Sequence, residues 1–160
     1  AELEGPVYLR FGRPKVPNFT PTDVPFEIGK AWTVSEGADV SIFATGHMVW
    51  KAVEAQAIVA EKGVNAEIIN IHTIKPLDVN AIIASVKKTG CAVTAEEHQR
   101  NGGLGDSVAQ TLGMKLPSPI EMVAVNDSFG ESGTPEQLLE KYGLNAESIV
   151  NAALKVIARK

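Results

Sequence analysis

Several things are scarce in this sequence of 160 residues. It has one cysteine, Cys91, which excludes a disulfide framework and fits a reducing compartment. No apolar run approaches the roughly 20 residues that a membrane-spanning helix needs. Neither sign of charge dominates, because 15 basic and 19 acidic side chains leave a net charge of −4. That balance gives no electrostatic reason to bind nucleic acid or an anionic membrane.

Common catalytic and targeting signatures are also missing. There is no G-x-S-x-G elbow and no H-E-x-x-H pair. The three histidines lack local metal-ligand spacing and have no cysteine pair beside them, so we expect no metal site. The first residues lack the basic and long apolar regions of a secretory signal. Together with the lone thiol, this predicts a cytoplasmic protein.

A regular alternation of apolar strands and helices is present. Apolar residues recur at helical spacing in each predicted helix, and glycine ends several of them. Strands that alternate with helices form βαβ units, so the sequence predicts a three-layer α/β/α domain with a mostly parallel sheet. The predicted strands cover residues 38–46, 65–74, 91–97 and 120–127, and the predicted helices cover residues 47–63, 75–90, 102–115 and 145–160.

Capping residues support these boundaries. Asp78 and Asn145 are the expected N-caps of two helices, because a short polar side chain can accept a hydrogen bond from the first turn. A further short helix is expected to begin at Pro135, a favoured first helical residue, with Ser132 or Thr134 as its cap. Capping explains these polar residues without a ligand, although Asp127, Glu131 and Ser132 would also suit a pocket.

The first 25 residues do not fit the alternation. "GPVYLRFGR" predicts a strand with alternating faces, but a single short strand is not stable alone. Residues 14–25 hold four prolines, which block both helix and strand pairing and predict an extended linker. We therefore interpret the segment before the linker as the last strand of something absent from this sequence.

Ligands of such sheets usually bind beyond the carboxyl ends of the strands. The stretch "EEHQRNGGLGDSVAQ" lies at one such end. Amides of Gly102, Gly103 and Gly105 at a helix start, with His98 nearby, would suit an anion. However, "GGLG" lacks both the dinucleotide spacing and the lysine of a P-loop, and it also fits a tight corner that only glycine allows. Glu96 and its neighbour should point to opposite faces of the strand, which argues against a paired-carboxylate site.

Several phrases closely resemble the C-terminal part of transketolase, especially the split type in which two polypeptides share the enzyme. Related domains occur in deoxyxylulose phosphate synthase and in the beta subunits of 2-oxo-acid dehydrogenases. The resemblance covers essentially the whole chain. The phrases that carry it are "GPVYLRFGR", "DVSIFATGHMVWKAVEA", "INIHTIKPLD", "EEHQRNGGLGDSVAQ" and "FGESGTPEQLLEKYGL".

The resemblance implies a division of the chain. Residues 1–13 would be the last strand of a pyrimidine-binding domain, residues 14–25 a linker and residues 26–160 the transketolase C-terminal domain. Transketolases transfer a two-carbon ketol unit between sugar phosphates with thiamine diphosphate and a divalent metal, Mg. The parts that hold this cofactor are absent here, so we expect this chain alone to bind no cofactor, to have no catalytic residue and to be inactive.

The resemblance also implies one substrate contact and several partners. In the family, an arginine after the last pyrimidine-domain strand contacts the sugar phosphate, and Arg13 matches that position, with Arg10 as a competitor. The expected partners are the remaining transketolase domains or an N-terminal subunit, in a homodimer that this domain supports. Two rival functions remain open: a stand-alone regulatory or anion-binding module, and an interaction domain that docks a partner enzyme subunit.

Overall fold

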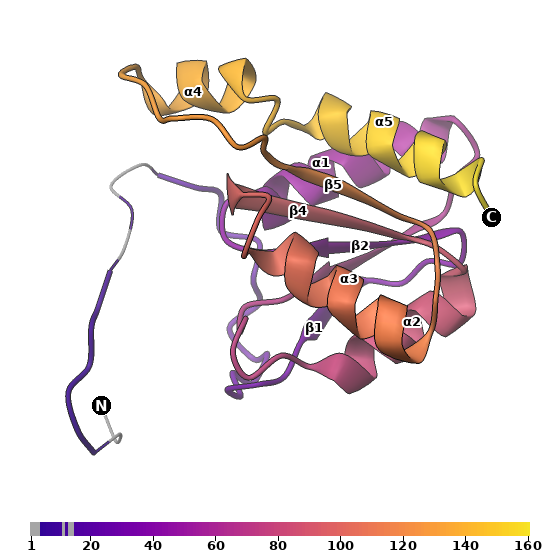
Figure 1. The fold of residues 1–160 in the computed structure, drawn as a ribbon, viewed down its shortest axis with the longest axis horizontal. Coiled ribbons are helices and arrows are strands. Elements are labelled where there is room, and N and C mark those ends of the chain that lie inside the picture. Colours follow the sequence, from indigo (N-terminus) through magenta and orange to yellow (C-terminus); the bar gives the residue numbers. More distant parts are fainter. Residues whose placement is uncertain (1–3, 11, 13–14) are drawn as a thin grey trace.

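The computed structural model describes residues 4–10, 12 and 15–160. A five-stranded sheet with the order β1-β3-β2-β4-β5 forms its centre, and helices cover both faces (Figure 1). Neighbouring strands run parallel except β1, which pairs antiparallel with β3. The three-layer α/β/α fold with a mostly parallel sheet, predicted from the sequence, is confirmed.

Most element boundaries lie within three residues of those predicted from the sequence, but β3 ends four residues earlier and α2 begins four residues later than predicted. The strands are β1 (Trp32–Ser35), β2 (Val40–Ala44), β3 (Ala66–Asn70), β4 (Ala92–Gln99) and β5 (Ile120–Val125). The helices are α1 (Met48–Glu61), α2 (Val79–Thr89), α3 (Leu104–Lys115), α4 (Pro135–Lys141) and α5 (Ala146–Ile157).

Two apolar clusters hold the layers together, one on each face of the sheet. The larger cluster lies under α1 and α5, where Ile42 and Ile68 are fully buried. The smaller cluster lies under α2 and α3 and contains Phe43. Every residue of β2 is buried, because a central parallel strand is covered by helices on both faces.

The edge strand β1 was not predicted from the sequence. This strand has only four residues, and it extends the sheet beyond β3 as an antiparallel edge. Its β-branched and aromatic residues suit a strand, but four residues between polar segments give too short a pattern to distinguish from a loop.

Three helix caps match the sequence analysis. The Asp78 carboxylate accepts from the Ala81 amide at 3.0 Å, and Asn145 caps α5 in the same way. Thr134, rather than Ser132, caps α4, and it forms a reciprocal capping box with Gln137. These caps satisfy amides that a helix start would otherwise leave without a partner.

The segment before the domain contains no helix or strand among its described residues, 4–10, 12 and 15–25. The Phe19 ring nevertheless anchors this segment, because it lies 6.0 Å from the Trp50 ring of α1. Residues 4–10 extend away from the sheet, with no pairing partner among the described residues (Figure 1). A strand requires such a partner, so the predicted strand stays a prediction for the complete protein.

Cys91 lies immediately before β4 and is buried, as a packed core thiol should be. Burial raises the pKa of this thiol, which favours its protonated, less nucleophilic form. Among the described residues, no helix is both long and apolar enough to cross a membrane.

Candidate functional site

The carboxyl ends of β2 and β4 form the crevice where doubly wound sheets usually bind ligands. These strands are neighbours, but α1 leads from β2 toward β3 while α3 leads from β4 toward β5, on the opposite side. Chain connections that diverge in this way leave a crevice beyond the strand ends. The loop after β2 and the end of β4 line it.

A cavity of about 710 Å³ opens at this edge beneath α4. Its walls combine apolar side chains with ionisable ones, as small-molecule sites commonly do. Among the described residues that line it there is no serine, cysteine or lysine that would serve as a nucleophile. These lining residues are Arg10, Gly12, Gly46, His47, Glu97, His98, Val125, Pro135, Leu138, Leu139, Tyr142 and Leu144.

A close contact between a histidine and a carboxylate crosses the crevice. His47 Nδ1 lies 3.1 Å from Glu97 Oε2, and both side chains are about one-third exposed. The contact joins the loop after β2 to the end of β4. It therefore partly fills the position that a ligand would take in this fold.

The neighbouring carboxylate, Glu96, turns to the opposite face and is buried. It accepts hydrogen bonds from the backbone amides of Leu104 and Gly105, each at 2.7 Å. These amides belong to the first turn of α3, where unpaired donors and the helix dipole favour a negative charge. Glu96 thus supplies an internal anion that ties β4 to α3.

Glycine makes room for this carboxylate. A Cβ atom at Gly103 would lie 2.0 Å from Glu96 Oε2, which no real structure tolerates. A Cβ atom at Gly105 would meet the Met122 sulfur at 2.8 Å. Gly103 and Gly105 are therefore needed for close packing between helix and sheet, as the corner interpretation predicted, whereas a Cβ atom at Gly102 would meet nothing within 4 Å.

A family model decides the identity of this fold. The description "Transketolase, C-terminal domain" matches residues 29–149. The chain belongs to the transketolase C-terminal domain family. The resemblance drawn from the sequence phrases is confirmed.

Individual relatives of this transketolase domain agree. The chain is 45% identical to a 6-deoxy-6-sulfo-D-fructose transketolase subunit of Clostridium sp. (strain MSTE9), with 98% of this chain and 49% of that protein covered. It is 37% identical to a putative transketolase C-terminal section of Methanocaldococcus jannaschii, with 100% and 51% covered. The chain spans about half the length of these curated relatives.

A solved structure extends the likeness to three dimensions. It is described as a split gene transketolase in an inactive β4 tetramer. The two chains superpose with a TM-score of 0.92 at 45% identity, covering 98% of this chain and 52% of that one.

The histidines of this transketolase domain are only partly brought together. His47 and His98 line the same cavity, and His98 is exposed. His72 lies apart from that cavity, where its ring faces Phe26 at 4.7 Å between centroids. Among the described residues, no group of three or more His, Cys, Asp or Glu side chains is placed to hold a metal ion.

The anion site expected at Gly102, Gly103 and Gly105 meets a specific obstacle. The Gly105 amide already donates to Glu96, and the Gly102 amide donates to Asp106 at 2.6 Å. An external anion would have to displace the Glu96 and Asp106 carboxylates, or it would be repelled by them. The geometry therefore disfavours anion binding at the Gly102 and Gly105 amides.

The expected substrate residue Arg13 lies outside the described residues. Its competitor Arg10 is described and lines the cavity beneath α4. Neither the role of Glu96 nor the His47–Glu97 contact was predicted from the sequence. The sequence did hold a signal for the role of Glu96. This glutamate lies at a strand end, and glycines follow it seven and nine residues later at the start of a helix.

Proposed function

We propose that this chain is the C-terminal part of a thiamine diphosphate-dependent transketolase that transfers a two-carbon ketol unit between sugar phosphates in the cytoplasm. One observation carries the proposal. A protein named as a transketolase subunit matches 98% of this chain at 45% identity. The domain is structural, and its catalytic chemistry belongs to the rest of the enzyme.

The start of α3 does not fit the diphosphate of the cofactor, and the described residues do not fit its Mg ion. A diphosphate needs free amides or cations, but two amides at the start of α3 already serve Glu96. A metal ion needs clustered ligands, and the described residues offer no such group. We therefore assign the cofactor and its metal to the remaining domains or to an N-terminal subunit, and we derive no catalytic step from this chain.

We assign residues 1–13 to the pyrimidine-binding domain as its last strand, and residues 14–25 to the linker. The exposure of Val7, Tyr8 and Leu9 supports this assignment, because each is at least 65% exposed in the chain alone. A run of alternating apolar residues with no local partner suits a strand that completes another sheet. The C-terminal domain then covers residues 26–160.

Arg13 is the one substrate contact that we assign to this chain. A guanidinium binds phosphate through paired hydrogen bonds, so its loss should weaken sugar-phosphate binding more than turnover. In the complete enzyme, Arg13→Ala should raise KM for the sugar phosphate about 10- to 100-fold. Arg10→Ala is the matched control and should change KM less than threefold.

Steady-state kinetics of ketol transfer, with thiamine diphosphate and Mg supplied, checks both variants. The opposite ranking would move the substrate contact to Arg10. No ketol transfer by the complete, cofactor-loaded protein would refute the proposed function itself.

We further propose that the domain supports a homodimer of the complete enzyme. This domain has no catalytic residue of its own in the proposed enzyme, so we expect it to serve the complete enzyme in another way. Deleting residues 26–160 from the complete enzyme should shift its sedimentation toward the monomer at micromolar concentration. Unchanged sedimentation would remove this part of the proposal.

A further inference from the structure

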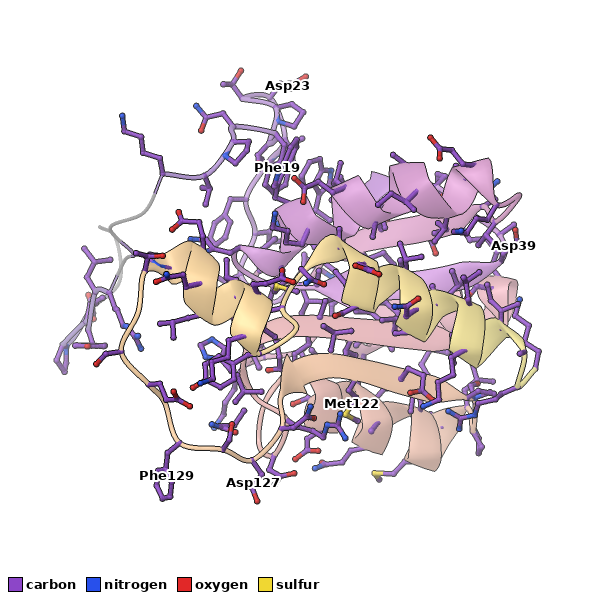
Figure 2. All side chains as sticks on the ribbon, turned by 90° about the horizontal axis from the view of Figure 1, so that it is seen from above. Phe19, Asp23, Asp39, Met122, Asp127 and Phe129 are labelled. Carbon is purple, nitrogen blue, oxygen red and sulfur yellow. The ribbon has the colours of Figure 1, made fainter. Side chains whose placement is uncertain are left out.

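Residues 126–141, the loop after β5 together with α4, form an arm that extends past the carboxyl edge of the sheet (Figure 1). Every residue from 126 to 137 is exposed, and α4 has no buried residue. Near the start of the arm, Phe129 is 96% exposed. Figure 2 shows this side chain directed away from the body of the domain.

The arm is held in a defined conformation. Gln99 at the end of β4 donates to the Ser128 carbonyl at 2.8 Å, and the Tyr142 hydroxyl donates to the Phe129 carbonyl at 3.0 Å. Asp127 adopts a φ of 48°, which is strained for a non-glycine residue. Two side-chain hydrogen bonds thus hold the backbone that presents an apolar ring to solvent.

Such a fixed, exposed aromatic side chain is typical of an interface anchor. Aromatic side chains dominate binding energy when a partner pocket covers them, and a fixed backbone lowers the entropy lost on association. The remainder of the arm is acidic, with four carboxylates and one lysine, and that lysine pairs with Glu131. Its partner should therefore offer an apolar pocket with a basic rim.

The surroundings of the arm identify the partner. Residues 4–10 leave the domain on the same side of the molecule as the arm (Figure 1). The region matched here is about half of each curated relative. In the proposed complete transketolase, a second part of similar size would therefore contact this domain. We expect this second part to contact the domain on the side where residues 4–10 lead away from it.

We propose that Phe129 is the anchor by which this domain docks onto the cofactor-carrying part of its transketolase. The inference rests on the proposed function, since it takes that part as the partner. The ring enters an apolar pocket there, and the acidic side chains around it face basic groups. The arm, rather than the strand-end cavity, then fixes the position of the C-terminal domain.

Hydroxyl-radical footprinting of the native proteins tests this docking. Met114 on α3 is the matched control, because it is also apolar and 83% exposed but lies outside the arm. Phe129 should be oxidised at least about 10-fold more slowly in the complete enzyme than in this chain alone. Met114 should react at similar rates in both samples.

A variant gives the second readout. In the complete enzyme, Phe129→Ala should make the arm accessible to protease, while Met114→Ala should not. Equal oxidation of Phe129 in both samples would overturn the docking. Protection that appears in this chain alone as its concentration rises would also overturn it, in favour of a second copy as the partner.

Ketol transfer measured on the same samples separates the two proposals. An active enzyme with an exposed Phe129 overturns the docking but leaves the function intact. A protected Phe129 in an enzyme that transfers no ketol unit refutes the function but supports the docking.

Discussion

Two regions at the carboxyl edge of the sheet differ in what they bury: one buries a carboxylate, and the other exposes an aromatic ring. At the corner between β4 and α3, a buried carboxylate satisfies two helix amides and two glycines make space for it. In the arm after β5, twelve successive residues are exposed, and an aromatic side chain contacts solvent. The difference indicates that the corner serves the domain itself, whereas the arm is shaped for something outside it.

Removing the internal anion should have the largest effect on the corner. Glu96→Ala leaves two buried amides without an acceptor, and each such loss costs about 1–3 kcal/mol. We expect the free energy of unfolding to fall by about 3 kcal/mol, measured by urea denaturation. Glu97→Ala, on the exposed face of the same strand, is the control and should cost less than about 1 kcal/mol. Equal effects of the two variants would contradict the capping role of Glu96.

Filling the space beside the carboxylate should have the next largest effect. Gly103→Ala places a Cβ atom against Glu96, so we expect a loss of about 2 kcal/mol. Gly102→Ala meets no atom within 4 Å, although its φ of 83° disfavours alanine, and should cost about 1 kcal/mol.

A double-mutant cycle makes this prediction sharper. In the Glu96→Ala background the obstructing carboxylate is gone, so the cost of Gly103→Ala should fall by at least half. Additive effects would mean that the Cβ atom at position 103 collides with something other than Glu96.

At the opposite end of the sheet, Glu121 near the start of β5 is a partly buried carboxylate. Burial raises the pKa of Glu121, but hydrogen bonds and charge from Lys155 and Arg159 outweigh it and hold this pKa below its ordinary 4.5. A lowered pKa in the folded state stabilises the fold above the unfolded pKa, and this stability is lost as pH falls through the folded value.

Glu121→Gln should therefore cost about 0.5 kcal/mol at pH 7, and nothing once the pH is well below 4.5. Urea denaturation at several pH values measures this, with the exposed Glu61→Gln as the control for a lost charge. A cost that stays constant down to the lowest pH would show that the ion pairs with Glu121 contribute nothing.

The arm should show the smallest effect on stability. In this chain alone, Phe129→Ala should change the free energy of unfolding by less than about 0.5 kcal/mol, because the ring is exposed. Thermal and urea denaturation check this result. A larger loss would mean that the ring packs within its own domain and is not available to a partner.

The sequence predicted the periodic elements well and the long-range contacts poorly. The strands and helices from residue 38 onward follow from apolar periodicity, and the caps Asp78 and Asn145 follow from local residue preferences. These features depend on neighbours only a few residues away. The edge strand β1 was missed because its stability comes from pairing with β3, which lies more than 30 residues later.

The site shows the same limit. The alternation of a strand correctly placed Glu96 and Glu97 on opposite faces. It did not reveal which face holds the start of α3, because that contact depends on how the corner closes in three dimensions. From the sequence, the arm was predicted only as a short capped helix. The exposure of Phe129 could not be predicted, because it depends on whether a distant part of the chain covers this residue.

Hydrogen–deuterium exchange of this chain alone and within the complete transketolase tests the central division most directly. We predict that the amides of Leu104 and Gly105, which donate hydrogen bonds to Glu96, exchange slowly in both samples. Amides of residues 128–134 should exchange quickly in the chain alone and at least about 10-fold more slowly in the complete enzyme. Fast exchange of residues 128–134 in both samples, or protection of the corner only in the complete enzyme, would contradict the account.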